Sequence, residues 1–125
     1  MRISADGDVG IGTTNPTAKL TVAGNIHSRE VKVSVDAGAD YVFNEDYGLK
    51  SLSQVEEFVK TNRHLPEIAP AAQMQKEGLN LGEMNIVLLR KIEELTLYLI
   101  EQNKKLEKQE LLINSLMENT VKAGK

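Results

Sequence analysis

Few residues of this sequence have the types and spacing that chemistry requires. The stretch GDVGIGTTNPTAKLTVAGNI, residues 7–26, contains a G-x-G at Gly10 and Gly12. A dinucleotide-binding fingerprint needs a third glycine and a helix that begins directly after the turn. Here Asn15 takes the third position, Pro16 follows, and the next residues alternate as a strand does. The stretch therefore predicts a β-segment whose glycines permit tight bends and close backbone approach, not a phosphate site.

A serine and a lysine, residue types that can act as a nucleophile and its base, stand close together at Ser28 and Lys32. In a strand, these side chains share one face and lie about 13 Å apart at about 3.3 Å per residue. Direct proton transfer needs hydrogen-bond reach, so this spacing argues against self-cleavage. We predict no catalytic residues and no enzymatic activity.

Candidate metal ligands are also sparse. His27 and His64 are the only histidines, and the chain contains no cysteine. Three copies of His27 could reach one metal only across a three-fold axis, and His64 is expected to cap or pack its loop. Asp40, Glu45 and Asp46 do not match a calcium-binding loop and are expected to be solvated. We predict no metal and no cofactor.

The composition excludes several classes of partner. The net charge is −3 and the pI is about 5.4, and no basic stripe is present to neutralise phosphates, so we expect no nucleic acid. No apolar run approaches the roughly 20 residues of a membrane span. The first residues carry no signal-peptide pattern, and we expect this chain to be the C-terminal part of a longer protein.

Residues 1–35 are predicted to form short strands. The segments VGIGT, AKLTVAG and REVKVSV alternate apolar and polar residues, with turn residues between them. A sheet this small cannot bury enough apolar surface to be stable alone. The segment therefore needs neighbours, either upstream repeats or copies from other chains.

Residues 36–80, called the knob below, are predicted to form a small α/β unit. ADYVFNEDYGL is expected to be a loop and a strand, with Tyr41 and Phe43 on one side and Val42 on the other.

Two helices are expected in the knob. SLSQVEEFVKT, residues 51–61, begins with the capping box Ser51 and Gln54. A short helix over residues 70–77 is expected to end at Gly78, where a left-handed residue is wanted.

The clearest element is a helix over residues 81–120, followed by a disordered tail over 121–125. Asn80 is the expected N-cap, with Glu83 three residues on. The stretch holds no proline, and its only glycine is Gly82. At about 1.5 Å per residue it forms a helix about 60 Å long.

This helix carries a heptad repeat of aliphatic residues. Position a holds Ile92, Leu99, Leu106, Ile113 and Thr120, and position d holds Leu88, Leu95, Gln102, Gln109 and Leu116. Seven of these ten positions are aliphatic, which meets the coiled-coil criterion. We predict that nine of these residues form the trimer interface, and we call them the seam. They are Leu88, Ile92, Leu95, Leu99, Gln102, Leu106, Gln109, Ile113 and Leu116.

No other segment has a stripe of matching length, so the predicted partner is another copy of the chain. The apolar stripe widens at Ile86, Val87, Leu89 and Ile100, which favours more than two helices or contact with the knob. The polar d residues cost stability but fix register. We predict a trimer; the pattern alone also allows a dimer, and the alternative is a long helix folded back on its own domain.

The residues also carry a resemblance. GDVGIGTTNPTAKLTVAGNI resembles the repeat that closes the shafts of many phage tail fibres and related bacterial fibres. The remainder strongly resembles the C-terminal tail-fibre domain of Bacteroidetes and their phages and prophages, most specifically at DYVF, HLPEI, GLNLGEMN and LLRKIEELTLYLIEQNKKL. The resemblance implies an α+β fold: an intertwined homotrimeric fibre end with a β-structured shaft, a small α/β knob and a long trimeric coiled coil.

A more distant resemblance is to the intramolecular chaperones of endosialidases and tail spikes, which trimerise fibres and then cut themselves off. Their Ser-Asp motif, with a lysine five residues after the serine, is not reproduced at Ser28, because the aspartate is missing and Lys32 is four residues on.

Three functions follow as expectations. The first is a structural and assembly module that nucleates trimerisation at the end of a fibre and sets the register of its shaft. The second is a receptor-binding tip whose knob recognises a bacterial surface glycan or protein, and the third is a self-cleaving chaperone. The expected location is a virion tail fibre, a contractile injection system or another extracellular appendage.

Overall fold

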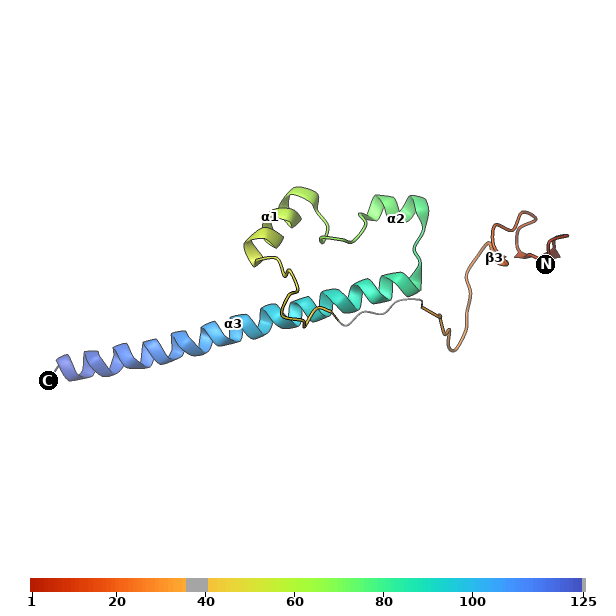
Figure 1. Ribbon diagram of the computed structural model, residues 1–125. Coiled ribbons are helices and arrows are strands. Elements are labelled where there is room, and N and C mark those ends of the chain that lie inside the picture. Colours follow the sequence, from red (N-terminus) through yellow and green to blue (C-terminus); the bar gives the residue numbers. More distant parts are fainter. Residues whose placement is uncertain (36–40, 125) are drawn as a thin grey trace. The chain divides into compact units, whose positions relative to one another are not determined.

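The computed structural model describes residues 1–35 and 41–124. The chain folds as two compact units, Met1–Val33 and Ser34–Lys125, and each is described by itself. The first unit holds a small sheet and the second holds helices, so the expected α+β class is confirmed at this level (Figure 1).

The first unit is a three-stranded sheet in the order β1-β2-β3. Strand β1, Arg2–Ile3, pairs antiparallel with β2, Val9–Ile11, and β2 pairs in parallel with β3, Leu20–Val22. Parallel neighbours usually need a long crossover, but residues 12–19 join β2 to β3 directly. The chain therefore advances by stacking one short strand on the next.

The glycines of the G-x-G act through the backbone, as expected. A Cβ on Gly10 would lie 2.5 Å from the carbonyl oxygen of Thr13. Gly12 has φ of +76°, and a Cβ there would lie 3.0 Å from the carbonyl oxygen of Ala23. Among the described residues the next helix begins only at Leu52, so no helix N-terminus directly follows this turn to hold a phosphate.

The predicted strand REVKVSV is wrong for the single chain: residues 29–35 form no ladder. A strand is stable only when a neighbour satisfies its backbone groups, and the described residues place none beside it. In residues 29–35 the side chains of Val31, Val33 and Val35 are at least half exposed, as are those of Ile3 and Leu20 in the sheet. The first unit therefore has no hydrophobic core of its own.

Helix α1, Leu52–Asn62, confirms the first predicted helix and its cap. The Ser51 side chain accepts from the Gln54 amide at 3.2 Å, and the Gln54 side chain accepts from the Ser51 amide at 2.9 Å. The helix ends at Arg63, whose φ of +60° is left-handed.

Helix α2, Ala71–Glu77, confirms the second prediction, with Pro70 as its N-cap. Gly78 ends it with φ of +80°, but its ψ of −170° is not that of the expected left-handed cap. Glycine is still favoured at this position because φ is positive.

Helix α3, Leu81–Ala123, is 43 residues long. Asn80 is its N-cap, but the side chain caps no helical N–H; its Nδ2 lies 3.4 Å from the Glu83 Oε2 instead. The helix runs past residue 120 into the predicted disordered tail 121–125, because no glycine interrupts it before Gly124. Figure 1 shows its C-terminal part extending beyond the knob, and every residue of α3 from Asn103 onward is exposed.

The predicted strand around Tyr41 and Phe43 is also wrong where the structure describes it; its start at 36–40 lies outside the described residues. Turns form instead, closed by hydrogen bonds from the amide of Asn44 to the Tyr41 carbonyl and from the amide of Tyr47 to the Asn44 carbonyl. Val42 is buried and Phe43 is exposed. Contacts between this segment and α3, described below, outweigh the strand pattern.

The capping box gives a first test. Replacing Ser51 by Ala removes one of the two reciprocal bonds and is expected to destabilise the knob by about 1 kcal/mol. Ser53→Ala is the matched control, because Ser53 lies exposed inside the same helix and is expected to leave stability nearly unchanged. Chemical denaturation followed by circular dichroism measures both, and equal losses would contradict the capping role.

Candidate functional site

The predicted interface residues all lie on one side of α3, and all but Gln102 are exposed in the single chain. The exposed fraction of the seven aliphatic seam residues runs from 45% at Leu88 to 71% at Leu99. Gln102 is half-buried and Gln109 is exposed. Residues spaced three and four apart share a helix face, so the seam is one stripe that is apolar except at Gln102 and Gln109.

A second stripe on α3 is covered by the chain itself. It consists of Met84, Val87, Lys91, Glu94 and Tyr98, which again are spaced alternately three and four residues apart, and all are buried or half-buried. We call it the knob-facing stripe. It is rotated from the seam by about one residue, or roughly 100°, so the chain covers one face of the helix and leaves the neighbouring face exposed.

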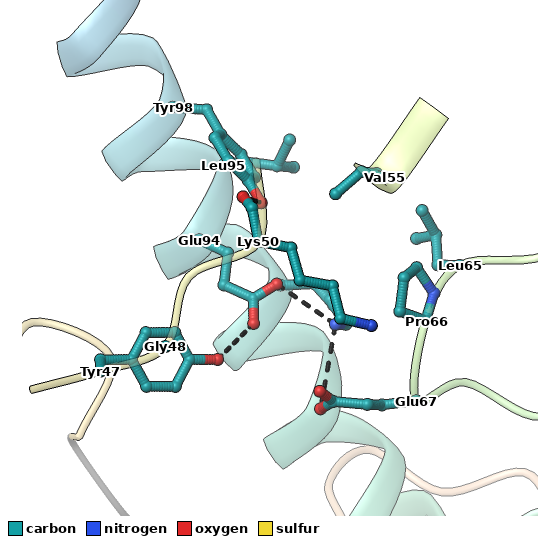
Figure 2. A pocket seen from close by; sticks show the side chains of 11 residues that line it. Tyr47, Gly48, Lys50, Val55, Leu65, Pro66, Glu67, Glu94, Leu95 and Tyr98 are labelled. Carbon is teal, nitrogen blue, oxygen red and sulfur yellow. Dashed lines mark hydrogen bonds and ion pairs between the residues drawn. The ribbon is translucent and has the colours of Figure 1, made fainter. Parts of the chain in front are cut away.

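Three tyrosine hydroxyls attach the knob to α3. The Tyr47 hydroxyl donates to the Glu94 carboxylate (Figure 2). The Tyr98 hydroxyl donates to the carbonyl of Lys50 at 2.6 Å. The guanidinium of Arg90 donates to the Tyr41 hydroxyl. Each bond crosses from the loop before α1 to the long helix.

Ion pairs connect the loop after α1 to the same helix. The Glu67 carboxylate lies 3.1 Å from Arg90 and 3.9 Å from Lys91, and Lys91 lies 3.2 Å from Glu94. The Lys91 and Glu94 side chains are only 11% and 13% exposed, so these charges are less screened than a surface pair. Two carboxylates and two cations balance, which satisfies the requirement that buried charges be paired.

The backbone of Glu67 has φ of +66°, a conformation that a non-glycine residue adopts at a cost. The ion pairs with α3 hold it there. The hydrogen bond to Tyr41 is the main cause that raises the pKa of Arg90, with the charge of Glu67 adding to it, so the guanidinium stays charged. Glu67 thus links the loop after α1 to α3 through ion pairs.

The pKa values of two tyrosines lie above the ordinary value. Burial is the largest cause for Tyr47, followed by its hydrogen bond to Glu94. Burial also raises the pKa of Tyr98, with the charge of Glu94 adding to it. Both hydroxyls therefore keep their protons well into the alkaline range.

A cavity of about 130 Å³ lies between α3 and the knob. Figure 2 shows Tyr47, Glu94 and Glu67 with their polar atoms along one side, and the side chains of Val55 and Leu65 across from α3. Leu95 also lines this cavity, although it belongs to the seam. The cavity therefore stands at the border between the face that the chain covers and the face that it leaves open.

The other candidate residues form no reactive site. His64 packs edge-on against Phe58, with ring centroids 5.4 Å apart, and its Nδ1 lies 2.9 Å from the Leu65 carbonyl oxygen, as expected for a loop-packing histidine. Ser28 and Lys32 are both exposed, and no hydrogen bond joins them.

His27, Glu45 and Asp46 are exposed, and Asp40 lies outside the described residues. Within 1–35 and 41–124, no three histidine or acidic residues gather as metal ligands. No helix of these segments is long and apolar enough to cross a bilayer.

Sequence reasoning missed the polar anchors Glu67, Arg90, Lys91, Glu94 and Tyr98. The signal was present, because a lone tyrosine within a long, otherwise non-aromatic helix continues a second stripe at helical spacing. The charged members of that stripe are indistinguishable in sequence from the solvated face of a coiled coil.

No protein-family model matches the sequence, and comparisons with curated proteins and with solved structures also gave no match.

The raised pKa of Tyr47 gives a pH-dependent test. Above pH of about 10, the ordinary tyrosine pKa, the unfolded chain loses a proton that the folded chain keeps, so the free energy of unfolding falls as pH rises. Tyr47→Phe is expected to reduce this decrease in the free energy of unfolding. The raised pKa of Tyr98 is expected to cause the decrease that remains. Denaturation of both proteins at about pH 8 and about pH 11 measures the slope, and an unchanged slope would contradict this assignment.

Proposed function

We propose that this chain is the structural and assembly module at the C-terminal end of a trimeric fibre. In this role, α3 nucleates association with two further copies and sets the register of the β-structured shaft. The observation that carries the proposal is the seam, whose aliphatic residues stay exposed along most of a 43-residue helix.

The cost of leaving the seam in water is large. Fully burying one leucine or isoleucine contributes about 2 kcal/mol, and the seam holds seven such residues. The knob covers a different stripe, so within the described residues no segment covers the seam. A partner helix of equal length with the same repeat is a second copy of the chain.

Three copies suit the pattern better than two. Near its C-terminal end, the apolar surface of α3 spreads beyond the seam onto both flanks, at Leu112 and Met117, which are each 63% exposed. A wider apolar face favours more than two helices. The polar layers at Gln102 and Gln109 favour one register at some cost in stability.

The first unit supports the fibre setting. Its short strands stack directly on one another and leave Ile3, Ile11 and Leu20 exposed. Such a sheet gains stability from neighbouring chains or from further repeats. Because strand contacts between chains are non-local and slow to form, a helix that gathers the copies first would align them.

The resemblance to tail-fibre C-termini directs the proposal to a phage tail fibre or a contractile injection system that attaches to a bacterial surface. A trimer also multiplies weak contacts with a surface glycan or protein into avidity. The receptor-binding role, which is a property of the knob, is compatible with this assembly.

A matched pair of variants tests the proposal. Leu106 is on the seam and Leu111 is off it, yet in the single chain they are 62% and 70% exposed, and both lie inside α3. Leu106→Asp is expected to lower the oligomeric mass or raise the dissociation constant strongly, at about 2 kcal/mol per copy. Leu111→Asp is expected to leave the mass unchanged.

Light scattering and analytical ultracentrifugation measure both variants at micromolar concentration. Should the natural chain be a monomer there, or should both variants associate equally well, the assembly function is refuted.

A further inference from the structure

We propose that the cavity beside Leu95 is an intersubunit pocket, completed by Thr96 of a neighbouring copy packing against Leu65 and Leu95. This inference rests on the proposed function, because it requires the helices to associate through the seam. It adds that the knob of each chain also belongs to the interface and lies against its neighbour's helix.

The position of the cavity on α3 leads to this inference. In helical projection, Leu95 lies about 40° from Lys91 and about 60° from Tyr98, at about 100° per residue. All three line the cavity. In a trimer, each helix has a neighbour on either side of its a and d residues. One of these neighbours therefore lies over the flank that carries Lys91 and Tyr98.

That flank is unusual for a coiled coil. Lys91 and Tyr98 occupy g positions, where side chains ordinarily pair with e residues of the next helix. Here both are already engaged within their own chain, Lys91 with Glu94 and Tyr98 with the Lys50 carbonyl. The neighbour's e flank therefore meets the knob and the cavity mouth rather than free g side chains.

The e flank has the chemistry that this arrangement needs. Its members at this level are Leu89, Thr96 and Asn103, none of which is charged. The Thr96 hydroxyl already donates to the Ile92 carbonyl at 2.9 Å, so burying it leaves no unpaired hydroxyl. On the other side, Leu65 is 46% exposed although it lines the cavity. The uncharged e flank of the neighbouring copy thus faces the apolar edge that Leu65 forms at the cavity.

Rotational symmetry sets which residues meet. A cyclic trimer whose three-fold axis runs along the centre of the helix bundle makes the helices parallel and places equal residue numbers at equal heights. The cavity spans α3 from Lys91 to Tyr98. At this height the neighbour presents Thr96 from its e flank.

Cysteine crosslinking tests the contact, because the natural chain has no cysteine. Two full-length single-cysteine variants, Leu65→Cys and Thr96→Cys, carry different tags and are refolded together and oxidised. A two-chain product bearing both tags is expected, since a disulfide forms only when the two Cα atoms lie within about 7 Å.

Two controls separate the possible failures. Gln102→Cys alone reports on the seam and is expected to crosslink between copies. Ile100→Cys mixed with Leu65→Cys is expected to give no product, because Ile100 is exposed on the b face away from the seam.

Each other outcome is decisive. Crosslinking of Gln102→Cys without the Leu65–Thr96 product overturns the intersubunit pocket and leaves the assembly intact. Absence of the Gln102→Cys product overturns the assembly itself. Equal products from the Thr96→Cys and Ile100→Cys mixtures show random collision and also overturn the pocket.

Discussion

The exposed aliphatic seam of α3 is the constraint on which the proposed role of this protein depends. A single chain buries very little: among the large hydrophobic side chains of the described residues, only Val42 and Tyr98 are buried. Small domains are stable only when they remove enough apolar surface from water. In the described part of the chain most of the apolar surface that stays exposed lies on α3 and in the small sheet.

Two neighbouring faces of α3 differ in their surroundings, because the knob covers one face and leaves the seam exposed. Its knob-facing stripe is held by polar bonds from Tyr47, Glu67 and Lys50 rather than by an apolar core. These bonds depend on geometry, so they fix how the helix is rotated relative to the knob. With that rotation the seam stays exposed, as the proposed association through it requires.

The same arrangement explains why Glu67 adopts a left-handed backbone. Its carboxylate must reach Arg90 and Lys91 from a loop that has just left α1 through a second positive-φ residue, Arg63. Two charge pairs that are partly shielded from water offset the conformational cost. The loop is thereby held against α3, where Pro66 is also buried.

Much of the secondary structure of this protein was determined by the sequence alone. Helical spacing, the Ser51 capping box and the absence of proline specify α1, α2 and α3, because these signals act within a few residues. The glycines at Gly10 and Gly12 were predictable for the same reason. The seam could be located by its heptad, although its burial against other copies, and their number, stay predictions.

Only the tertiary structure decided how the knob meets the helix. Alternation predicted strands at 29–35 and around Tyr41, but a strand requires a partner that local pattern cannot supply. The role of Tyr98, and of the charges beside it, was likewise hidden, because a charged residue on a helix has the same sequence signature whether it faces water or a partner. Pairing across 47 residues, as between Tyr47 and Glu94, is a property of the folded chain and not of any segment.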